Sequence, residues 1–119
     1  MDDDRFRTPG SHYEHEEVFA VAAVPRLARI DWSPGSYVPE STLWLPEPLF
    51  DSLAVNTVLA GLPRHEQNRL SSTTCRALAE QLRSIVFPDD SERLAASLVT
   101  EVASRVGELS DHVLLVEGP

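Results

Sequence analysis

The sequence predicts a mainly α-helical fold, a small bundle of three or four helices wrapped by an extended strap rich in proline and aromatic residues. The strongest observation is the segment 89–109, where apolar residues recur at three- and four-residue spacing and form one stripe on a helix. A second, very apolar segment follows Pro48, and the four prolines within 32–48 exclude a regular helix there. Apolar runs near both ends of the chain could be short strands, so an α+β fold is the alternative. The stripe consists of Leu94, Leu98, Val102, Val106 and Leu109.

Length and composition indicate one domain. The chain has 119 residues, of which 42% are hydrophobic, and a chain of this size buries about two-thirds of its unfolded surface. Residues 1–12 are predicted to be a flexible acidic tail, and 13–119 a single helical domain. No apolar run approaches the roughly 18 residues of a membrane helix, and the acidic start MDDDRFR is unlike a secretory signal. The single cysteine, Cys75, is typical of a reducing compartment, so we expect a cytoplasmic protein.

The charge of the chain restricts its chemistry and its partners. The net charge is −9, and all ten basic residues are arginines. Without lysine, the chain cannot form a Schiff base with a side-chain amine or build a phosphate-binding loop around a lysine. An acidic surface repels nucleic acid and anionic lipids, and it attracts basic partners.

The region before the strap has two interpretations. Ser11 and Glu14 have the spacing of a capping box, which predicts a helix over 12–24 that ends at Pro25. The same run is rich in β-branched residues and could instead be a buried strand that continues through 27–32. We favour the helix, followed by the strap over 32–48.

The second half of the chain predicts further helices. Residues 49–60 are expected to form a central helix with Gly61 as its left-handed cap. Residues 64–87 are expected to form one kinked helix, or two with a cap at Ser71 or Ser72. Asp89 should cap the last helix, with Glu92 in the reciprocal capping position. Residues 113–116 are predicted to be a short edge strand or an apolar tail docked on the bundle.

Few residues have the spacing of a catalytic or metal site. His12 and His15 could share a zinc ion on a helix, but no third ligand is evident, so no metal site is predicted. Cys75 shares a helix face with Leu78 and Leu82, which indicates a buried thiol rather than a nucleophile. The pairs His65–Glu66 and Asp111–His112 are interpreted as surface groups rather than acid–base couples.

One segment resembles a known family. The stretch LSSTTCRALAEQL, residues 70–82, is similar to the recognition helix of helix-turn-helix regulators. The resemblance implies that Ser72, Thr73 and Arg76 would face the major groove of DNA. The chain departs from the family pattern before this segment, with His65 where a small residue is usual and Arg69 where the turn glycine is usual.

We therefore expect a non-catalytic, acidic interaction module, such as an inhibitor, an immunity-type protein or an accessory subunit. It would bind a protein partner with a basic surface, and it would need no cofactor. A helix-turn-helix DNA-binding regulator is the alternative, and a small enzyme or enzyme subunit is the third hypothesis. The predicted partner-binding residues are the aromatic side chains of the strap and two carboxylates beside them: Trp32, Tyr37, Trp44, Glu40 and Glu47.

Overall fold

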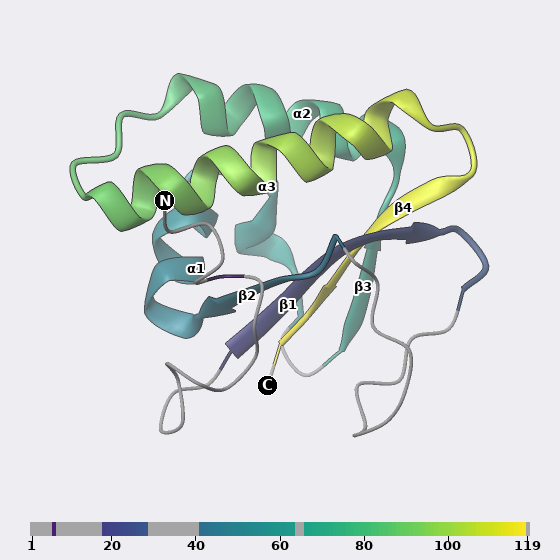
Figure 1. Ribbon diagram of the computed structural model, residues 1–119, viewed down its shortest axis with the longest axis horizontal. Helices are drawn as coiled ribbons and strands as arrows, with labels where there is room; N and C mark the ends of the chain where they lie inside the picture. Colours follow the sequence, from purple (N-terminus) through teal and green to yellow (C-terminus); the bar gives the residue numbers. More distant parts are fainter. Residues whose placement is uncertain (1–5, 7–17, 29–40, 64–65, 119) are drawn as a thin grey trace.

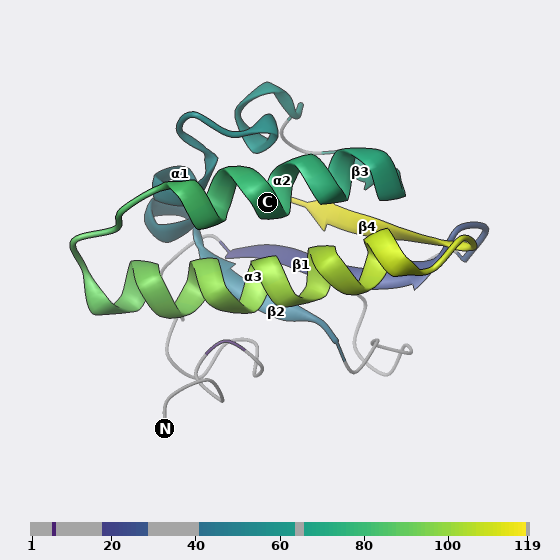
Figure 2. The same ribbon diagram turned by 90° about the horizontal axis from the view of Figure 1, so that it is seen from above.

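The computed structural model of the chain describes residues 6, 18–28, 41–63 and 66–118. Its described part is an antiparallel sheet of four strands with the helices α2 and α3 packed side by side on one face (Figures 1 and 2). The prediction of a helical bundle is therefore wrong, because the fold is α+β. In chain order the elements are β1 Val18–Pro25, β2 Leu43–Pro46, α1 Glu47–Ala54, the 3-10 helix η2 Val58–Gly61, β3 Gln67–Leu70, α2 Ser72–Ser84, α3 Asp90–Glu108 and β4 His112–Glu117.

The sheet has the strand order β2-β1-β4-β3, so the first and last described strands pair at its centre. Val21 lies opposite Leu43 of β2 on one side and opposite Val116 of β4 on the other. The hydroxyl of Ser41 continues the pairing beyond β2, since its Oγ accepts a bond from the Ala23 amide at 3.2 Å and donates to the Ala23 carbonyl at 3.3 Å.

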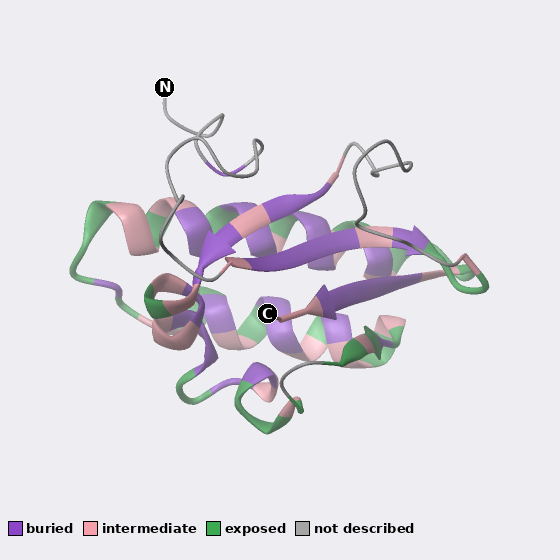
Figure 3. Cartoon of the chain, turned by 90° about the horizontal axis from the view of Figure 1, so that it is seen from below, coloured by how far each residue is buried: buried purple, intermediate pink, exposed green. Residues whose placement is uncertain are grey.

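The favoured helix over 12–24 is wrong where the structure describes it, because 18–25 form strand β1. Both faces of this strand are buried, which explains the mistake. Phe19 and Val21 point into the core under the helices, whereas Ala22 and Val24 belong to a second apolar cluster on the other face with Val113 and Leu115. Figure 3 shows β1 and β4 buried along most of their length. A strand buried on both faces shows no alternation of apolar and polar residues.

The predicted helix over 49–60 is shorter in the structure, and its predicted glycine cap is wrong. α1 ends at Ala54, and the residue with a left-handed backbone is Asn56, with a φ of 68°. Thr57 then stops the helix, because its buried hydroxyl reaches the carbonyl oxygens of Leu53 and Ala54, both at 3.0 Å. Asparagine tolerates the left-handed region better than most residues, which allows the turn here.

The helix starts predicted for α2 and α3 are confirmed. The Ser71 hydroxyl accepts a bond from the Thr74 amide at the start of α2, and Asp89 caps α3. The helix predicted before Ser71 is wrong, because residues 67–70 form the edge strand β3. For the run 113–116, the alternative of a strand is confirmed, but this strand lies at the centre of the sheet and not at its edge.

The apolar stripe predicted on the last helix is largely confirmed. Leu98, Val102 and Val106 are buried between α2 and the sheet, and Leu94 packs against the same core. Leu109 is the exception, because it follows the end of α3 and is 37% exposed. Burying a large aliphatic side chain is worth about 1.5–3 kcal/mol, so this stripe contributes much of the burial energy of the domain. Among the described helices, none is long and apolar enough to cross a membrane.

Candidate interaction groove on the helical layer

A groove of about 480 Å³ lies between the end of α2, the connection that follows it and the first half of α3. Its walls are mostly apolar, and the described residues that line it include no carboxylate. Val86, in the connection between the two helices, lines the groove and is 92% exposed. A valine exposed to this extent beside an apolar hollow can enter a partner without first leaving the core. The remaining apolar lining is Leu82, Ile85, Phe87 and Ala96.

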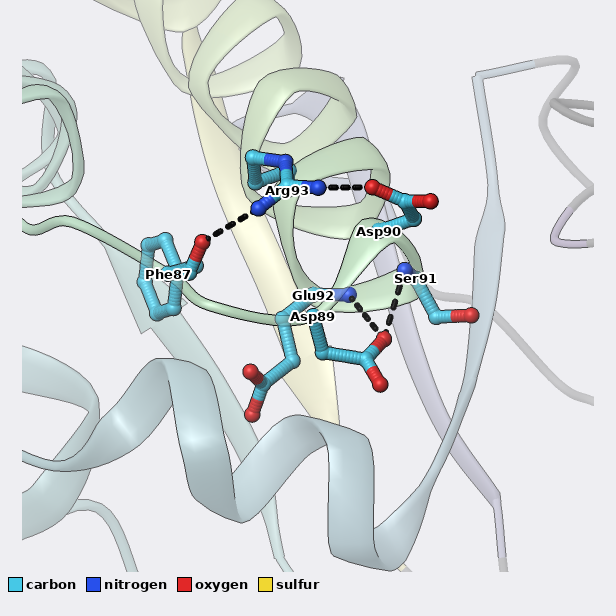
Figure 4. Close-up of polar contacts among 6 residues, drawn as sticks. All are labelled: Phe87, Asp89, Asp90, Ser91, Glu92 and Arg93. Atoms are coloured by element: carbon cyan, nitrogen blue, oxygen red, sulfur yellow. Dashed lines mark hydrogen bonds and ion pairs between the residues drawn. The ribbon is translucent and has the colours of Figure 1, made fainter.

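The position of Val86 follows from how α3 begins. Asp89 Oδ1 accepts hydrogen bonds from the backbone amides of Ser91 at 2.7 Å and Glu92 at 3.3 Å (Figure 4). Two of the amides that a helix start leaves unpaired are thereby satisfied. Among the described residues, the Glu92 carboxylate makes no hydrogen bond, so the reciprocal half of the predicted cap is not formed.

Arg93 ties the connection to the first turn of α3. Its Nη1 donates to the Phe87 carbonyl at 2.8 Å, and its Nη2 forms an ion pair with Asp90 (Figure 4). Phe87 is itself buried, which anchors the connection from inside. Val86 is therefore held outward between fixed neighbours, and the shape of the groove does not depend on a loose loop.

The groove is lined by two arginines whose charged ends already have partners. Arg93 is paired as described, and Arg83 Nη2 donates to Ser104 Oγ of α3 at 3.0 Å. Long arginine side chains can cover apolar surface with their methylene groups while the guanidinium stays polar. The groove consequently offers apolar contact with polar margins, rather than a strong site for an anion.

The candidate DNA-contacting residues lie at the start of α2. Thr73 and Arg76 are exposed and Ser72 is half-buried. Arg76 Nη1 donates to the carbonyl of Gly107 near the end of α3 at 2.9 Å. A Cβ atom at Gly107 would lie 2.9 Å from Arg76 Cγ, so glycine allows this close approach. The element before α2 is strand β3, whereas the helix-turn-helix resemblance requires a helix there.

The predicted partner-binding residues are only partly described. Trp44 is half-buried on the edge strand β2 opposite Ala20, and Glu47 is the half-buried first residue of α1. Neither residue lines the groove between α2 and α3. Trp32, Tyr37 and Glu40 lie outside the described residues, so their role stays a prediction.

The titratable groups show little sign of catalytic preparation. Burial raises the pKa of the Cys75 thiol to about 11, and its Sγ donates to the Leu70 carbonyl at 3.7 Å. The prediction of a buried thiol is confirmed, and at neutral pH this group is protonated. Among the described residues, no group of three or more His, Cys, Asp or Glu side chains could hold a metal ion. His12, His15 and His65 lie outside the described residues.

The pair Asp111–His112 does form a hydrogen bond. His112 Nδ1 lies 2.7 Å from Asp111 Oδ1, and this bond lowers the pKa of the Asp111 carboxyl. The pair lies in the turn between α3 and β4, where Asp111 is exposed, and it lines neither this groove nor the cavity described below. Its surroundings fit the interpretation as a surface pair.

Comparison of the chain with protein-family models, with curated proteins and with solved structures finds no match in any of the three. The geometry and chemistry of the described residues are therefore the basis for the proposed function. Sequence reasoning missed the groove because it needs α2 and α3 side by side. The sequence signal that could have indicated it is Ile85-Val86, two apolar residues directly before Phe87-Pro88.

Proposed function

We propose that the protein is a non-catalytic interaction module that binds a protein partner with a basic surface, and that the partner docks in the groove between α2 and α3. The observation that carries the proposal is Val86, which is 92% exposed at the edge of a mostly apolar groove. Exposed apolar surface next to a preformed hollow is typical of a docking site, because its burial releases water without reorganising the protein.

The net charge of the chain supports a basic partner, which would approach a groove that is itself lined by Arg83 and Arg93. The chain carries a net charge of −9, and the start of α3 beside the groove carries Asp89, Asp90 and Glu92. Carboxylates at the margin of an interface raise the association rate of a basic partner more than they raise the final affinity. We therefore expect apolar contact in the groove to determine how long the complex lasts, and the acidic margin to determine how fast it forms.

The absence of a visible reaction centre in the described residues also favours binding over catalysis. The buried thiol of Cys75 is held in its protonated form, and the Asp111–His112 pair lies on an exposed turn. Nucleophilic catalysis requires a base within hydrogen-bond reach of the nucleophile, and among the described residues the Cys75 thiol bonds to the Leu70 carbonyl and to no basic side chain.

The test compares two variants that change equally exposed apolar side chains. Val86→Asp alters the groove, and Leu27→Asp alters a residue that is 89% exposed in the turn after β1, at the other end of the molecule (Figure 1). Both variants should keep the stability of the wild type within about 0.5 kcal/mol, because neither side chain is buried. Affinity capture from cells that express the protein naturally, followed by quantitative mass spectrometry, identifies the partner and measures how much of it each variant retains.

The expected result is one protein that the wild type and Leu27→Asp retain and that Val86→Asp loses. This protein should have a basic isoelectric point, and its association rate should fall as the salt concentration rises. Equal capture by all three proteins would contradict docking in the groove. Capture of an acidic partner would contradict the proposed role of the charge.

Nucleic-acid binding is the second candidate, and the exposure of Thr73 and Arg76 at the first turn of α2 favours it. Fluorescence anisotropy with random duplex DNA at low salt tests this candidate, since binding to phosphates weakens steeply as salt increases. Under this alternative, Arg76→Ala would weaken binding, whereas Val86→Asp would leave it unchanged. The protein-interaction proposal expects no salt-sensitive DNA binding.

A further inference from the structure

A second hollow lies beside α1, and its chemistry is unlike that of the groove. It is a cavity of about 240 Å³ between the ends of β1, β3 and β4 and the segment that contains α1 and η2. Aromatic and aliphatic side chains form most of its walls. Those used in the argument below are Phe19, Phe50, Ala54, Leu59, Leu62 and Val116.

One wall of the cavity is a fixed pair of aromatic rings. Phe19 of β1 and Phe50 of α1 stack with ring centroids 3.9 Å apart and an angle of 2° between their planes. Gly118 lies against the Phe19 ring, because a Cβ atom at this position would lie only 2.6 Å from Phe19 Cε2. The Phe19 ring therefore contacts both Phe50 and Gly118, so it cannot easily rotate into the cavity.

The segment that covers the cavity is equally well fixed. The Thr57 hydroxyl joins the end of α1 to η2, since its oxygen also accepts a bond from the Leu59 amide at 3.2 Å. The Val58 amide donates to Gln81 Oε1 of α2 at 2.9 Å. The cavity is thus part of the folded structure, and a ligand would not have to create it.

Asn68 supplies the one neutral amide among the described lining residues. Its Nδ2, which carries two hydrogens, donates to a set of three carbonyl oxygens, those of Pro63 at 3.0 Å, Glu66 at 3.2 Å and Val116 at 3.3 Å. Those bonds fix the amide group and leave its Oδ1 as an acceptor, to which no donor among the described residues bonds. Asp51 is the only ionisable side chain in the described lining, and its negative charge disfavours an anionic ligand.

We propose that this cavity binds a small, neutral aromatic molecule that carries one N–H or O–H donor, with the ring against the Phe19–Phe50 wall and the donor on Asn68 Oδ1. An apolar cavity of about 150 Å³ in another protein binds benzene, so the volume here accommodates one ring or two fused rings. The aromatic wall favours a flat ligand through offset or edge contacts. This inference concerns a site separate from the groove, and it does not rest on the proposed protein partner.

Three related ligands test the inference on the full chain. Indole is the probe, 1-methylindole lacks the N–H donor, and indole-3-acetate adds a carboxylate. Titration followed by ¹H–¹⁵N correlation spectra should show indole shifting the amides of Leu59, Leu62 and Asn68 at millimolar concentration or below. The loss of one hydrogen bond should weaken 1-methylindole about threefold to tenfold, and the charge should weaken indole-3-acetate by at least as much.

Two variants complete the test. Ala54→Leu fills the cavity from α1, and Ala60→Leu fills it from an exposed position of η2 at which a larger side chain does not threaten folding. Both should abolish the indole shifts, whereas Ala77→Leu on α2, outside the cavity, should keep them. The inference is overturned if indole causes no shifts in the wild type, if all three ligands bind equally, or if Ala60→Leu binds indole as the wild type does.

Discussion

The two hollows of this protein differ in what surrounds them. The groove between α2 and α3 is open, has an almost fully exposed valine at its edge, and is lined by two arginines whose charged ends are already bonded. The cavity beside α1 is smaller, is walled by two stacked phenylalanines, and has one amide oxygen available. The exposed apolar edge of the first suits a macromolecule, whereas the volume of the second suits a single small ring.

The difference teaches that one small core can support two kinds of apolar site. The buried residues of α3 and the sheet form a continuous cluster that reaches both hollows. The groove depends on the cap and ion pair at the start of α3, and the cavity depends on the hydroxyl of Thr57. Variants in the shared core should therefore remove both sites, and variants in the local supports should separate them.

The largest effect is expected from the shared core. Val102→Asp places a carboxylate at a position of α3 that is 4% exposed. The free-energy cost of burying an unpaired charge is comparable to the whole stability of a typical domain, about 5–15 kcal/mol, so the variant should unfold or be severely destabilised. Thermal unfolding followed by circular dichroism should show no cooperative transition. Ser97→Asp, an exposed change on the same helix, serves as the control and should melt like the wild type. A cooperative transition in Val102→Asp would show that the stripe is not in the core.

A smaller effect, confined to the cavity side, is expected from Thr57→Val. The change keeps the shape of the side chain but removes the hydroxyl that serves Leu53, Ala54 and Leu59. Leaving such buried groups unpaired costs about 1–3 kcal/mol, which urea unfolding should report as a lower midpoint. Hydrogen exchange should accelerate over 55–62 more than at the start of α3. The matched control is Thr73→Val, where the hydroxyl is exposed.

The buried thiol of Cys75 predicts a dependence of stability on alkaline pH. The folded pKa of Cys75 is about 11, above the ordinary value of 9.0, so the folded chain holds this proton more tightly than the unfolded chain. The stabilisation is fully present below pH 9, and it declines between about pH 9 and 11 by at most about 1.4 kcal/mol per pH unit. Urea unfolding at pH 8 and pH 10 measures the slope. The stability of Cys75→Ala should decline less steeply with pH than that of the wild type, and equal slopes would refute the contribution of the thiol.

The smallest effect is expected at the turn that ends α1. Asn56 has a φ of 68°, a conformation that glycine adopts freely and that alanine adopts at a cost of about 1–2 kcal/mol. Asn56→Ala should therefore lower the free energy of unfolding by about 1 kcal/mol, whereas Asn56→Gly should change it by a few tenths of that value. Both variants should leave the groove and its partner binding intact. Equal stability of the two variants would contradict a left-handed turn at this position.

Local features of the fold could be predicted from the sequence, and features set by distant contacts could not. Asp89 and Ser71 identify their helix starts because a capping side chain bonds to amides two or three residues away. The pairing of Val21 with Val116 spans most of the chain, and no local pattern announces it. The sequence pattern predicts Gly61 as the left-handed residue that ends the helix. In the structure the helix ends earlier, beside Thr57, and the left-handed residue is Asn56.

The candidate site was even less accessible to sequence reasoning. Val86 looks like a core residue because it follows Ile85 in an apolar run, and only the Arg93 bonds to Phe87 and Asp90 explain why it points outward. Phe19 of β1 stacks on Phe50 of α1, but the sequence patterns predict a helix at both positions. The wall of the cavity could therefore not be predicted. Charge, by contrast, could be predicted directly, since −9 is a property of composition.

The central position of β4 in the sheet has a consequence for folding during translation. β1 and β2 emerge early and can form a hairpin, but the strand that completes the sheet beside β1 emerges after both long helices. Until then the apolar flank of β1 has no partner, and contacts between distant parts of a chain form slowly. The nascent chain should therefore need protection by chaperones until residue 117 has left the exit tunnel, and a translation product that stops at residue 111 should be a target for proteolysis.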